Sequence, residues 1–177
     1  MLAGVSGCLV CGSALFAFHG TARAQGAPKT GVAVKVIVIE APFRATGGKD
    51  ELLKAGGSIV LEPFVRTLDG MSADVTESKA VSYSVLTGDK SSPDRQATVT
   101  VGWTLKTIPH VNADGTIQLD VDVTDTELAP GGPPATMRQG LFNSLRLKDG
   151  NVARFGEWSR GSKIFAVFAS ASIYPGN

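Results

Sequence analysis

The feature that most constrains this chain is a two-residue alternation of apolar and polar side chains, interrupted at intervals by turn sequences. The clearest stretch is residues 117–124, in which Ile, Leu, Val and Val alternate with Gln, Asp, Asp and Thr. A period of two places the two kinds of side chain on opposite faces of a β-strand, whereas the period of a helix would mix them. From residue 58 onward the chain is therefore predicted to form strands with one buried face.

Several of the turns between the alternating segments carry a hairpin signal. Three of them are Asp-Gly pairs, namely Asp69-Gly70, Asp114-Gly115 and Asp149-Gly150. Such pairs are typical of tight hairpins because glycine adopts the positive φ that these turns require. The sequence thus predicts a mainly β fold, an antiparallel β-meander of long hairpins.

Two further elements are expected before the meander. Residues 32–40 are rich in β-branched side chains and apolar on both faces, which predicts a largely buried strand. Residues 49–55 begin with acidic residues and carry a lysine near their end, and Gly56-Gly57 follows them. This arrangement is typical of a helix of about two turns, so the fold should contain one short helix.

The first 24 residues have the composition of a signal peptide. An apolar stretch ends in Ala-Arg-Ala at residues 22–24, which fits the small-residue pattern of signal peptidase sites. We expect three parts: a signal peptide over residues 1–24, a short linker over residues 25–31 and one β domain over residues 32–177. Cleavage would remove both cysteines, Cys8 and Cys11. Two alternatives stay open, namely lipidation at Cys8, whose context is similar to a lipoprotein processing site, and an N-terminal anchor helix.

The charge balance argues against a nucleic-acid-binding protein. Lys and Arg number 17 against 16 Asp and Glu, so the formal net charge is +1, and no block of like charges occurs. Proteins that bind nucleic acids normally need a dense face of Lys and Arg to displace counterions from phosphates. We therefore expect no nucleic-acid partner.

Few residues could carry chemistry. His110 is the only histidine outside the expected signal peptide, and no Gly-x-Ser-x-Gly motif occurs, so a hydrolase centred on His110 is not favoured. The acidic residues Asp120, Asp122, Asp125 and Glu127 leave two alternatives, a Ca²⁺ site or a strand face turned to solvent or to the lumen of an assembly. We predict no catalytic, cofactor-binding or metal-binding residues and no enzymatic activity.

Five motifs follow one another in an order and spacing that resembles a known family. They are residues 34–40 (VKVIVIE), 58–70 (SIVLEPFVRTLDG), 101–109 (VGWTLKTIP), 112–121 (NADGTIQLDV) and 145–150 (LRLKDG). The order resembles the conserved C-terminal domain of the secretins, the outer-membrane pore subunits of type II and type III secretion and type IV pilus systems. The positions that carry this resemblance are Glu40, Pro63, Thr67, Asp69, Gly70, Gly102, Leu105, Pro109, Asp114, Gly115, Asp149 and Gly150. The resemblance implies a secretin-like β domain in which these residues have structural roles.

The chain departs from the family pattern at three places. Glu157 stands where the family's Gly-Gly-Leu has its second glycine. Residues 86–96 take the place of an inner-gate hairpin and are short, and we refer to them as the candidate gate. Residues 126–136, rich in Pro and Gly, take the place of an amphipathic lip that inserts into the outer leaflet in larger secretins, and we refer to them as the candidate lip.

The C-terminal part of the chain gathers aromatic side chains. They are Phe155, Trp158, Phe165, Phe168 and Tyr174. An interfacial aromatic girdle would explain them, and so would an ordinary sheet core. Long strands such as residues 98–109 also need a partner at every edge that is not covered.

The resemblance implies a function without catalysis. We expect an exported subunit that forms homo-oligomers by β-edge pairing and belongs to an outer-membrane secretion channel or a related envelope assembly. Its other partners would be secretion or pilus components, and its location the periplasm or the outer membrane. The alternative is a soluble periplasmic accessory or binding module with the same β fold and no pore.

Overall fold

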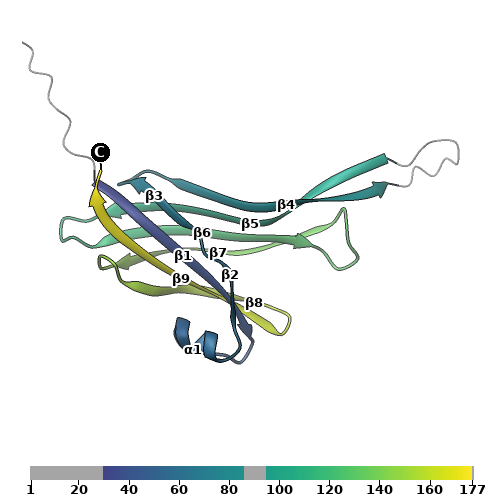
Figure 1. The fold of residues 1–177 in the computed structure, drawn as a ribbon, viewed down its shortest axis with the longest axis horizontal. Coiled ribbons are helices and arrows are strands. Elements are labelled where there is room, and N and C mark those ends of the chain that lie inside the picture. The colour runs from purple at the N-terminus through teal and green to yellow at the C-terminus, as the bar shows by residue number, and fades with distance from the viewer. Residues whose placement is uncertain (1–29, 86–94, 177) are drawn as a thin grey trace, which may run out of the picture.

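The computed structural model describes residues 30–85 and 95–176 (Figure 1). These residues form β1 (Thr30–Pro42), α1 (Lys49–Lys54), β2 (Ser58–Leu61), β3 (Phe64–Leu68), β4 (Ala73–Val85), β5 (Arg95–Val111), β6 (Ile117–Leu128), β7 (Thr136–Leu147), β8 (Val152–Arg160) and β9 (Lys163–Pro175). The expected signal peptide and the candidate gate up to residue 94 lie outside the described residues. The expected linker overlaps β1, which begins at Thr30.

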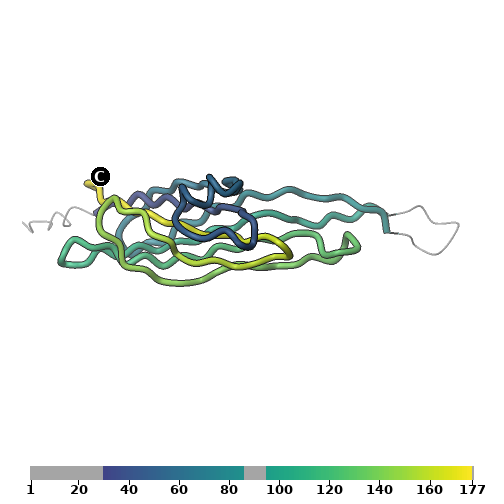
Figure 2. Tube along the Cα trace, turned by 90° about the horizontal axis from the view of Figure 1, so that it is seen from below, coloured from purple at the N-terminus to yellow at the C-terminus, as the bar shows by residue number. Residues whose placement is uncertain are grey.

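The strands form two sheets that pack face to face as two layers (Figure 2). Sheet A has the order β2-β1-β9-β8, with β3 also paired to β1, and sheet B has the order β4-β5-β6-β7. All strand pairs are antiparallel. The predicted antiparallel β fold with one short helix is confirmed. The predicted meander of consecutive hairpins is seen in sheet B and in the β8–β9 hairpin. Sheet A differs from a meander because it pairs the first strand, β1, with the last strand, β9.

The first and last strands pair along their full length in the middle of sheet A. Their register runs from Thr30 opposite Pro175 to Pro42 opposite Lys163. The even-numbered valines of β1, such as Val34 and Val36, face sheet B, while Ile37 and Ile39 face the helix side. Burial on both faces explains why β1 shows no alternation in the sequence.

The helix covers part of the outer surface of sheet A. Leu52 of α1 is fully buried against Ile39, Ala41 and Phe168. The helix spans Lys49–Lys54, one residue less than predicted, because Gly56 and Gly57 donate to helix carbonyls and end it. Within the described part of the chain, no helix is long and apolar enough to cross a membrane.

Residues 58–68, within the second family motif, form two strands that share one edge of β1. β2 pairs with residues 38–40 of β1 and β3 with residues 31–35. Pro63 stands at the break because it has no N–H to donate, and its carbonyl instead accepts a hydrogen bond from the Val36 N–H at 3.1 Å. The strands predicted from residue 58 onward are therefore interrupted at residues 62–63.

The main core lies between the two sheets. It contains buried side chains of β1, β5, β6, β8 and β9, among them Leu105, Ile117, Leu119, Val121 and Val123. Odd-numbered residues of β6 face sheet A and even-numbered residues face away. We call these the inner and outer faces of sheet B. The predicted alternation of residues 117–124 is confirmed by this arrangement.

The aromatic residues near the C-terminus belong mainly to the sheet cores. Phe155, Phe165 and Phe168 are buried, the first two between the sheets and the third beneath α1. Trp158 packs against the same inter-sheet core, and Tyr174 is half-buried at the end of β9. The core explanation of this group is therefore correct, and the girdle explanation is not.

The candidate lip is a loop with strand at both of its ends. β6 continues to Leu128 and β7 starts at Thr136, so only residues 129–135 form a loop between them. The loop is closed by a hydrogen bond from the Ala129 N–H to the Ala135 carbonyl at 2.9 Å. The irregular segment is thus shorter than its composition suggested.

Candidate functional site

Three Asp-Gly turns lie together at one end of the sandwich, where β1 starts and β9 ends (Figure 1). In two of them the aspartate binds the backbone of a distant strand. Asp69 Oδ1 accepts from the Val111 N–H at 2.8 Å, and Asp149 Oδ1 accepts from the Ile173 N–H at 3.0 Å. The turns therefore tie β3 to the end of β5 and β7 to the end of β9.

Asp114 organises the third turn, between β5 and β6. Its Oδ1 accepts hydrogen bonds from the Thr116 hydroxyl at 2.6 Å and from the Thr116 N–H at 3.1 Å, and its Oδ2 lies 2.7 Å from Arg146. The hydrogen bonds from Thr116, followed by those with Arg146, lower the pKa of Asp114 to about 2. Gly115 follows at φ +77°, a conformation that favours glycine.

The other family-motif residues are spread along the fold and do not meet in one pocket. Glu40 of β1 bonds Lys163 of β9, and Leu105 is buried in the inter-sheet core. The Pro109 carbonyl accepts from the Gly70 N–H at 2.7 Å, and the Thr67 hydroxyl donates to the Met71 carbonyl at 3.0 Å. Each of these contacts positions a strand end or a turn, so the motif maps onto the framework of the fold.

Gly102 marks the point where β5 leaves its neighbour β6. The β5–β6 pairing runs from Gly102 opposite Thr126 to Val111 opposite Ile117, whereas β4 stays paired with β5 as far as Arg95. Gly102 has φ +139°, and a Cβ there would lie 2.2 Å from the Glu77 carbonyl oxygen. Only glycine fits this position, which explains why a glycine of the sequence motif stands here.

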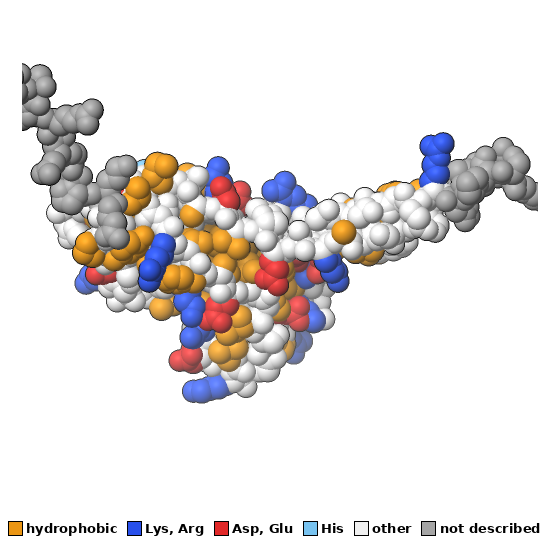
Figure 3. Space-filling view, turned by 45° about the horizontal axis from the view of Figure 1, so that its top comes forward, with side chains coloured by type: hydrophobic (Ala, Val, Ile, Leu, Met, Phe, Trp, Pro, Cys, Tyr) orange, Lys and Arg blue, Asp and Glu red, His pale blue; other side chains and the backbone are white. Residues whose placement is uncertain are grey.

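Beyond Gly102, sheet B continues as a two-stranded ribbon. We call residues 79–85 of β4 and 95–101 of β5 the arm. The arm extends from the body of the molecule, and acidic side chains lie where it leaves the body (Figure 3). Isolated two-stranded ribbons are only marginally stable in water, so the arm is a part of the structure that would gain from a partner.

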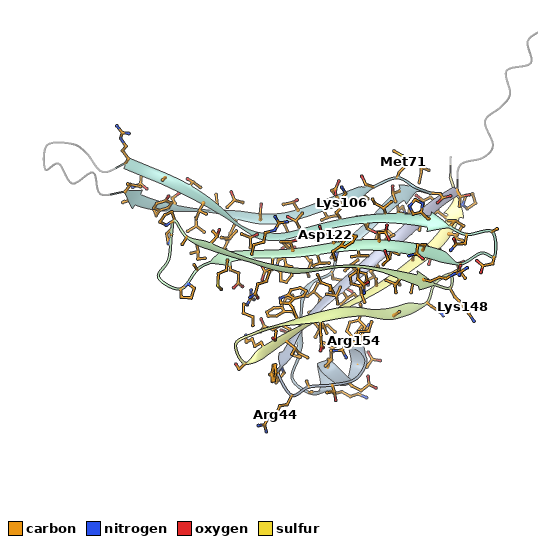
Figure 4. The ribbon with its side chains drawn as sticks, turned by 180° about the vertical axis from the view of Figure 1, so that it is seen from behind. Arg44, Met71, Lys106, Asp122, Lys148 and Arg154 are labelled. Atoms are coloured by element: carbon orange, nitrogen blue, oxygen red, sulfur yellow. The ribbon has the colours of Figure 1, made fainter. Side chains whose placement is uncertain are left out.

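The four acidic residues considered as a Ca²⁺ site do not come together. Asp120 and Asp122 lie on the outer face of sheet B, where Asp122 stands opposite Lys106 of β5 (Figure 4). Asp125 and Glu127 lie on the inner face, where both bind Arg160. In the described ranges, no group of three or more His, Cys, Asp and Glu side chains is arranged to hold a metal ion.

Arg160 forms an ion pair that the sequence analysis missed. Its Nη1 lies 2.6 Å from Asp125 Oδ2 and 2.8 Å from Glu127 Oε2, and its guanidinium lies 4.3 Å from the ring centre of Phe165. The Asp125 side chain is only 3% exposed. Of the ion pairs between described residues, those of Arg160 alone join sheet A to sheet B. We call Arg160, Asp125 and Glu127 the latch.

The latch covers an aromatic stack in the core. Trp158 and Phe165 are stacked with ring centres 5.4 Å apart, and Trp103 contacts both at 5.9 and 6.2 Å. Asp125 is odd-numbered and therefore lies on the face of β6 that is apolar over residues 117–123. An acidic residue on this buried face was the one sequence feature that indicated a buried partner of opposite charge. The sequence did not reveal that the partner is Arg160 of β8.

His110 lies beside one of the three Asp-Gly turns. It lies near the exposed end of β5, and a Cβ on Gly70 would approach its Cε1 to 3.7 Å. His110 thus covers the Asp69–Gly70 turn.

Sheet B has two strands with an unpaired edge. Within the described residues, β4 pairs only with β5 and β7 pairs only with β6. Neither pairing contains a register shift. By contrast, the β2/β3 edge of sheet A is broken at Pro63, and β8 contains a bulge between Arg154 and Gly156. Breaks and bulges protect edges from further pairing, so the regular edges of β4 and β7 are the ones suited to a partner.

Comparison with protein families decides what kind of chain this is. The model of the family "Secretin: Bacterial type II and III secretion system protein" matches residues 54–156. The chain belongs to the secretin family. The matched range includes all the motif residues proposed from the sequence except Glu40.

Solved secretin structures share the fold. The secretin in a pilotin–secretin complex, AspS–GspD of ETEC, gives a TM-score of 0.56 at 13% identity over 84% of this chain and 50% of that chain. The Salmonella SPI-1 type III secretion injectisome secretin InvG gives 0.52 at 11% identity over 85% and 66%. The Klebsiella pneumoniae type II secretion system outer membrane complex, with PulD, PulS and the PulC HR domain, gives a TM-score of 0.51 at 12% identity over 85% of this chain and 41% of that chain.

This secretin domain spans between 41% and 69% of the length of the solved secretin chains it matches. No curated protein sequence matched it. At these low identities the solved structures show a common fold, and this fold agrees with the predicted secretin-domain-like β architecture.

Proposed function

We propose that this chain is an exported, non-enzymatic structural subunit that joins copies of itself edge to edge and forms part of an outer-membrane secretion channel or a related envelope assembly. The observation that carries the proposal is the pair of regular, unpaired edges on sheet B. Because sheet B has four antiparallel strands, β7 of one copy and β4 of the next would run antiparallel. β4 has 13 residues and β7 has 12, so the two edges are matched in length.

Charges on the outer face favour this pairing. Asp74 lies on that face of β4, whereas Arg138 and Arg146 lie on the same face of β7. Opposite charges on adjacent strands stabilise an antiparallel pair, and like charges destabilise it. The two edges therefore attract each other more than either would attract a copy of itself.

The family supplies the setting of this assembly. Secretins of known structure are described in type II and type III secretion complexes, together with a pilotin or other secretion components. The corresponding partners of this chain would be components of a secretion or pilus system. The predicted signal peptide over residues 1–24 would deliver the chain to the periplasm, from which it would reach the outer membrane.

The test is whether the full-length chain assembles, and through which strands. We would express the chain in bacteria, extract the membranes with detergent, and examine the protein by light scattering and negative-stain microscopy. Rings or multimers that resist SDS are expected. A monodisperse monomer in detergent would exclude the assembly function.

Cysteine cross-linking identifies the strands. With Cys8 and Cys11 replaced by serine, Ser78→Cys on β4 would be combined in turn with Phe142→Cys and Ser144→Cys on β7. At least one combination should give cross-linked copies and so report the register. The matched control is Thr104→Cys, on the same face of central strand β5, which should give none with either β7 position.

One observation favours the alternative of a soluble periplasmic module without a pore. The outer face of sheet B is rich in hydroxyl groups, including Thr76, Ser78, Thr104, Thr124 and Thr126. Such a face is better suited to water than to lipid chains. Cell fractionation separates the two functions, because recovery of the chain only in the soluble periplasm would favour the module.

A further inference from the structure

The inner face of sheet B is not completely covered by sheet A. At the base of the arm lies a hollow of about 730 Å³, lined by β4, β5 and β6 together with Val60 of β2. Its apolar lining includes Val81, Val101 and Trp103. Its acidic lining consists of Glu77, Asp125 and Glu127.

The uncovered surface continues along the arm. The inner face of the arm carries Val81, Tyr83, Val85, Ala97, Val99 and Val101, with the cations Lys79 and Arg95 at its two ends. The opposite face carries Ala80, Ser82, Ser84, Gln96, Thr98 and Thr100. The arm is therefore amphipathic, and Val85 is 41% exposed on its apolar side. A ribbon that is apolar on one face normally packs that face against another element.

Sheet A extends past sheet B on the opposite side of the molecule from β4. In Figure 1 the helix α1 and the adjoining ends of β1, β8 and β9 lie beyond β7. This overhang ends in a corner formed by Phe43, Arg44 and Ser162. The Phe43 N–H donates to the Ser162 carbonyl at 2.9 Å, which holds the corner against the β8–β9 turn.

The corner presents an apolar and a basic side chain to solvent. Phe43 is 59% exposed, and Arg44 points away from the body of the molecule (Figure 4). Within the described residues, Arg44 forms no ion pair. The corner thus matches the hollow in chemistry, since the hollow combines apolar side chains with an excess of carboxylates.

We propose that the corner of one copy (Phe43, Arg44 and Ser162) packs into the hollow at the base of the arm of the next copy. This inference rests on the proposed assembly through β4 and β7. If β4 of the next copy continues sheet B beyond β7, the overhang of the first copy lies over the inner face of the next copy's sheet B. That face is where the hollow and the uncovered side of the arm are found.

The charges that line the hollow favour the corner of a neighbouring copy as its occupant. The lining carboxylates Glu77, Asp125 and Glu127 are accompanied by two cations, Lys79 in the lining and Arg160 of the latch. One negative charge is left over, and Arg44 would balance it. Phe43 would at the same time cover Val81 and Trp103 from water, which contributes through buried apolar area.

Disulfide cross-linking tests the contact directly. With Cys8 and Cys11 replaced by serine, we would mix one chain carrying Phe43→Cys with another carrying Val81→Cys, assemble them and oxidise. A cross-linked dimer of the two chains is expected. Ser82→Cys is the matched control, because it is adjacent to Val81 on the same strand and faces the other way, and it should cross-link at least about tenfold less.

The outcomes distinguish this contact from the assembly itself. If the β4–β7 cysteine pairs cross-link and Phe43→Cys with Val81→Cys does not, the corner does not occupy the hollow although the edges pair. Equal cross-linking of Val81→Cys and Ser82→Cys would also overturn the contact. If neither set cross-links, both the contact and the proposed assembly are wrong.

A charge-reversal pair gives a second measurement. Arg44→Glu should reduce the yield of assembled rings up to about fivefold, the range expected for one exposed ion pair. Glu77→Lys in the same chain should restore the yield. A double variant that assembles no better than Arg44→Glu alone would contradict the proposed position of Arg44.

Discussion

The Arg160 latch allows a quantitative test of how the two sheets are held together. Replacing Arg160 by leucine removes the one cation that binds Asp125 in the described part of the chain, and the Asp125 side chain is 3% exposed. Breaking a buried ion pair by removing one partner typically costs about 3–5 kcal/mol, because the remaining charge is left without compensation. We expect Arg160→Leu to lower the free energy of unfolding by about 4 kcal/mol, a large share of the stability of a typical domain.

Urea denaturation followed by tryptophan fluorescence is the appropriate assay. The chain has 2 tryptophans, Trp103 and Trp158, and both lie in the aromatic stack beneath the latch. With a urea dependence of about 2 kcal/mol per M, the loss corresponds to a midpoint lower by about 2 M. The measurement should be made at concentrations where light scattering shows a monomer, so that unfolding is not coupled to assembly.

Two further variants decide whether the reasoning is correct. The Arg146–Asp114 pair has a similar N–O distance, 2.7 Å against 2.6 Å, but its side chains are 57% and 55% exposed, so Arg146→Leu should cost far less than Arg160→Leu. Adding Asp125→Leu to Arg160→Leu removes the unpaired charge and should recover part of the loss. If Arg160→Leu costs no more than Arg146→Leu, the latch does not hold the sheets together.

Three more predictions concern the turns and the bend of β5. Gly102→Ala should prevent correct folding or lower the urea midpoint well beyond Gly115→Ala, because only the former brings a Cβ to within 2.2 Å of a carbonyl, while both have positive φ. The pKa of Asp114 is about 2 in the fold against 3.8 ordinarily, so this group stabilises the fold above pH 3.8 and the stabilisation is lost as the pH falls to 2. The protection of the amides in its turn, measured relative to their intrinsic exchange rates at each pH, should fall over that range, and constant protection would contradict it. Asp149→Ala should cost about 1 kcal/mol in urea denaturation through loss of the Ile173 hydrogen bond, and an unchanged midpoint would show that the bond contributes nothing.

Local sequence was a good guide wherever one face of a strand is buried. Residues 117–124 and the Asp-Gly turns predicted sheet B because alternation and turn chemistry act over a few residues. The pairing of β1 with β9 could not be predicted in this way. Those strands are 121 residues apart at their facing ends, Pro42 and Lys163, and both are apolar on two faces, so neither periodicity nor turn length relates one to the other.

The sequence predicted the residues that shape the turns of the fold, but it did not predict the ion pair that joins the two sheets. Asp69, Asp114 and Asp149 were recognised from their turns, and the structure shows what their carboxylates bind. Arg160 was missed, since an arginine before a Gly-Ser turn looks like an ordinary exposed residue. Its role depends on Asp125, 35 positions earlier on another sheet, and only the packing of the sheets brings the two together.

The two ends of the sandwich differ in a way that bears on assembly. At one end, the Asp-Gly turns bind neighbouring strands and satisfy their own polar groups, so this end is complete within one copy. At the other end, β5 leaves β6 at Gly102, the arm exposes an apolar face, and an acidic hollow lies at its base. The latch lies beside this hollow and keeps the sheets closed there. The proposed assembly accounts for this arrangement, because the buried ion pair would give the neighbouring copy a rigid wall to pack against where the apolar surface is uncovered.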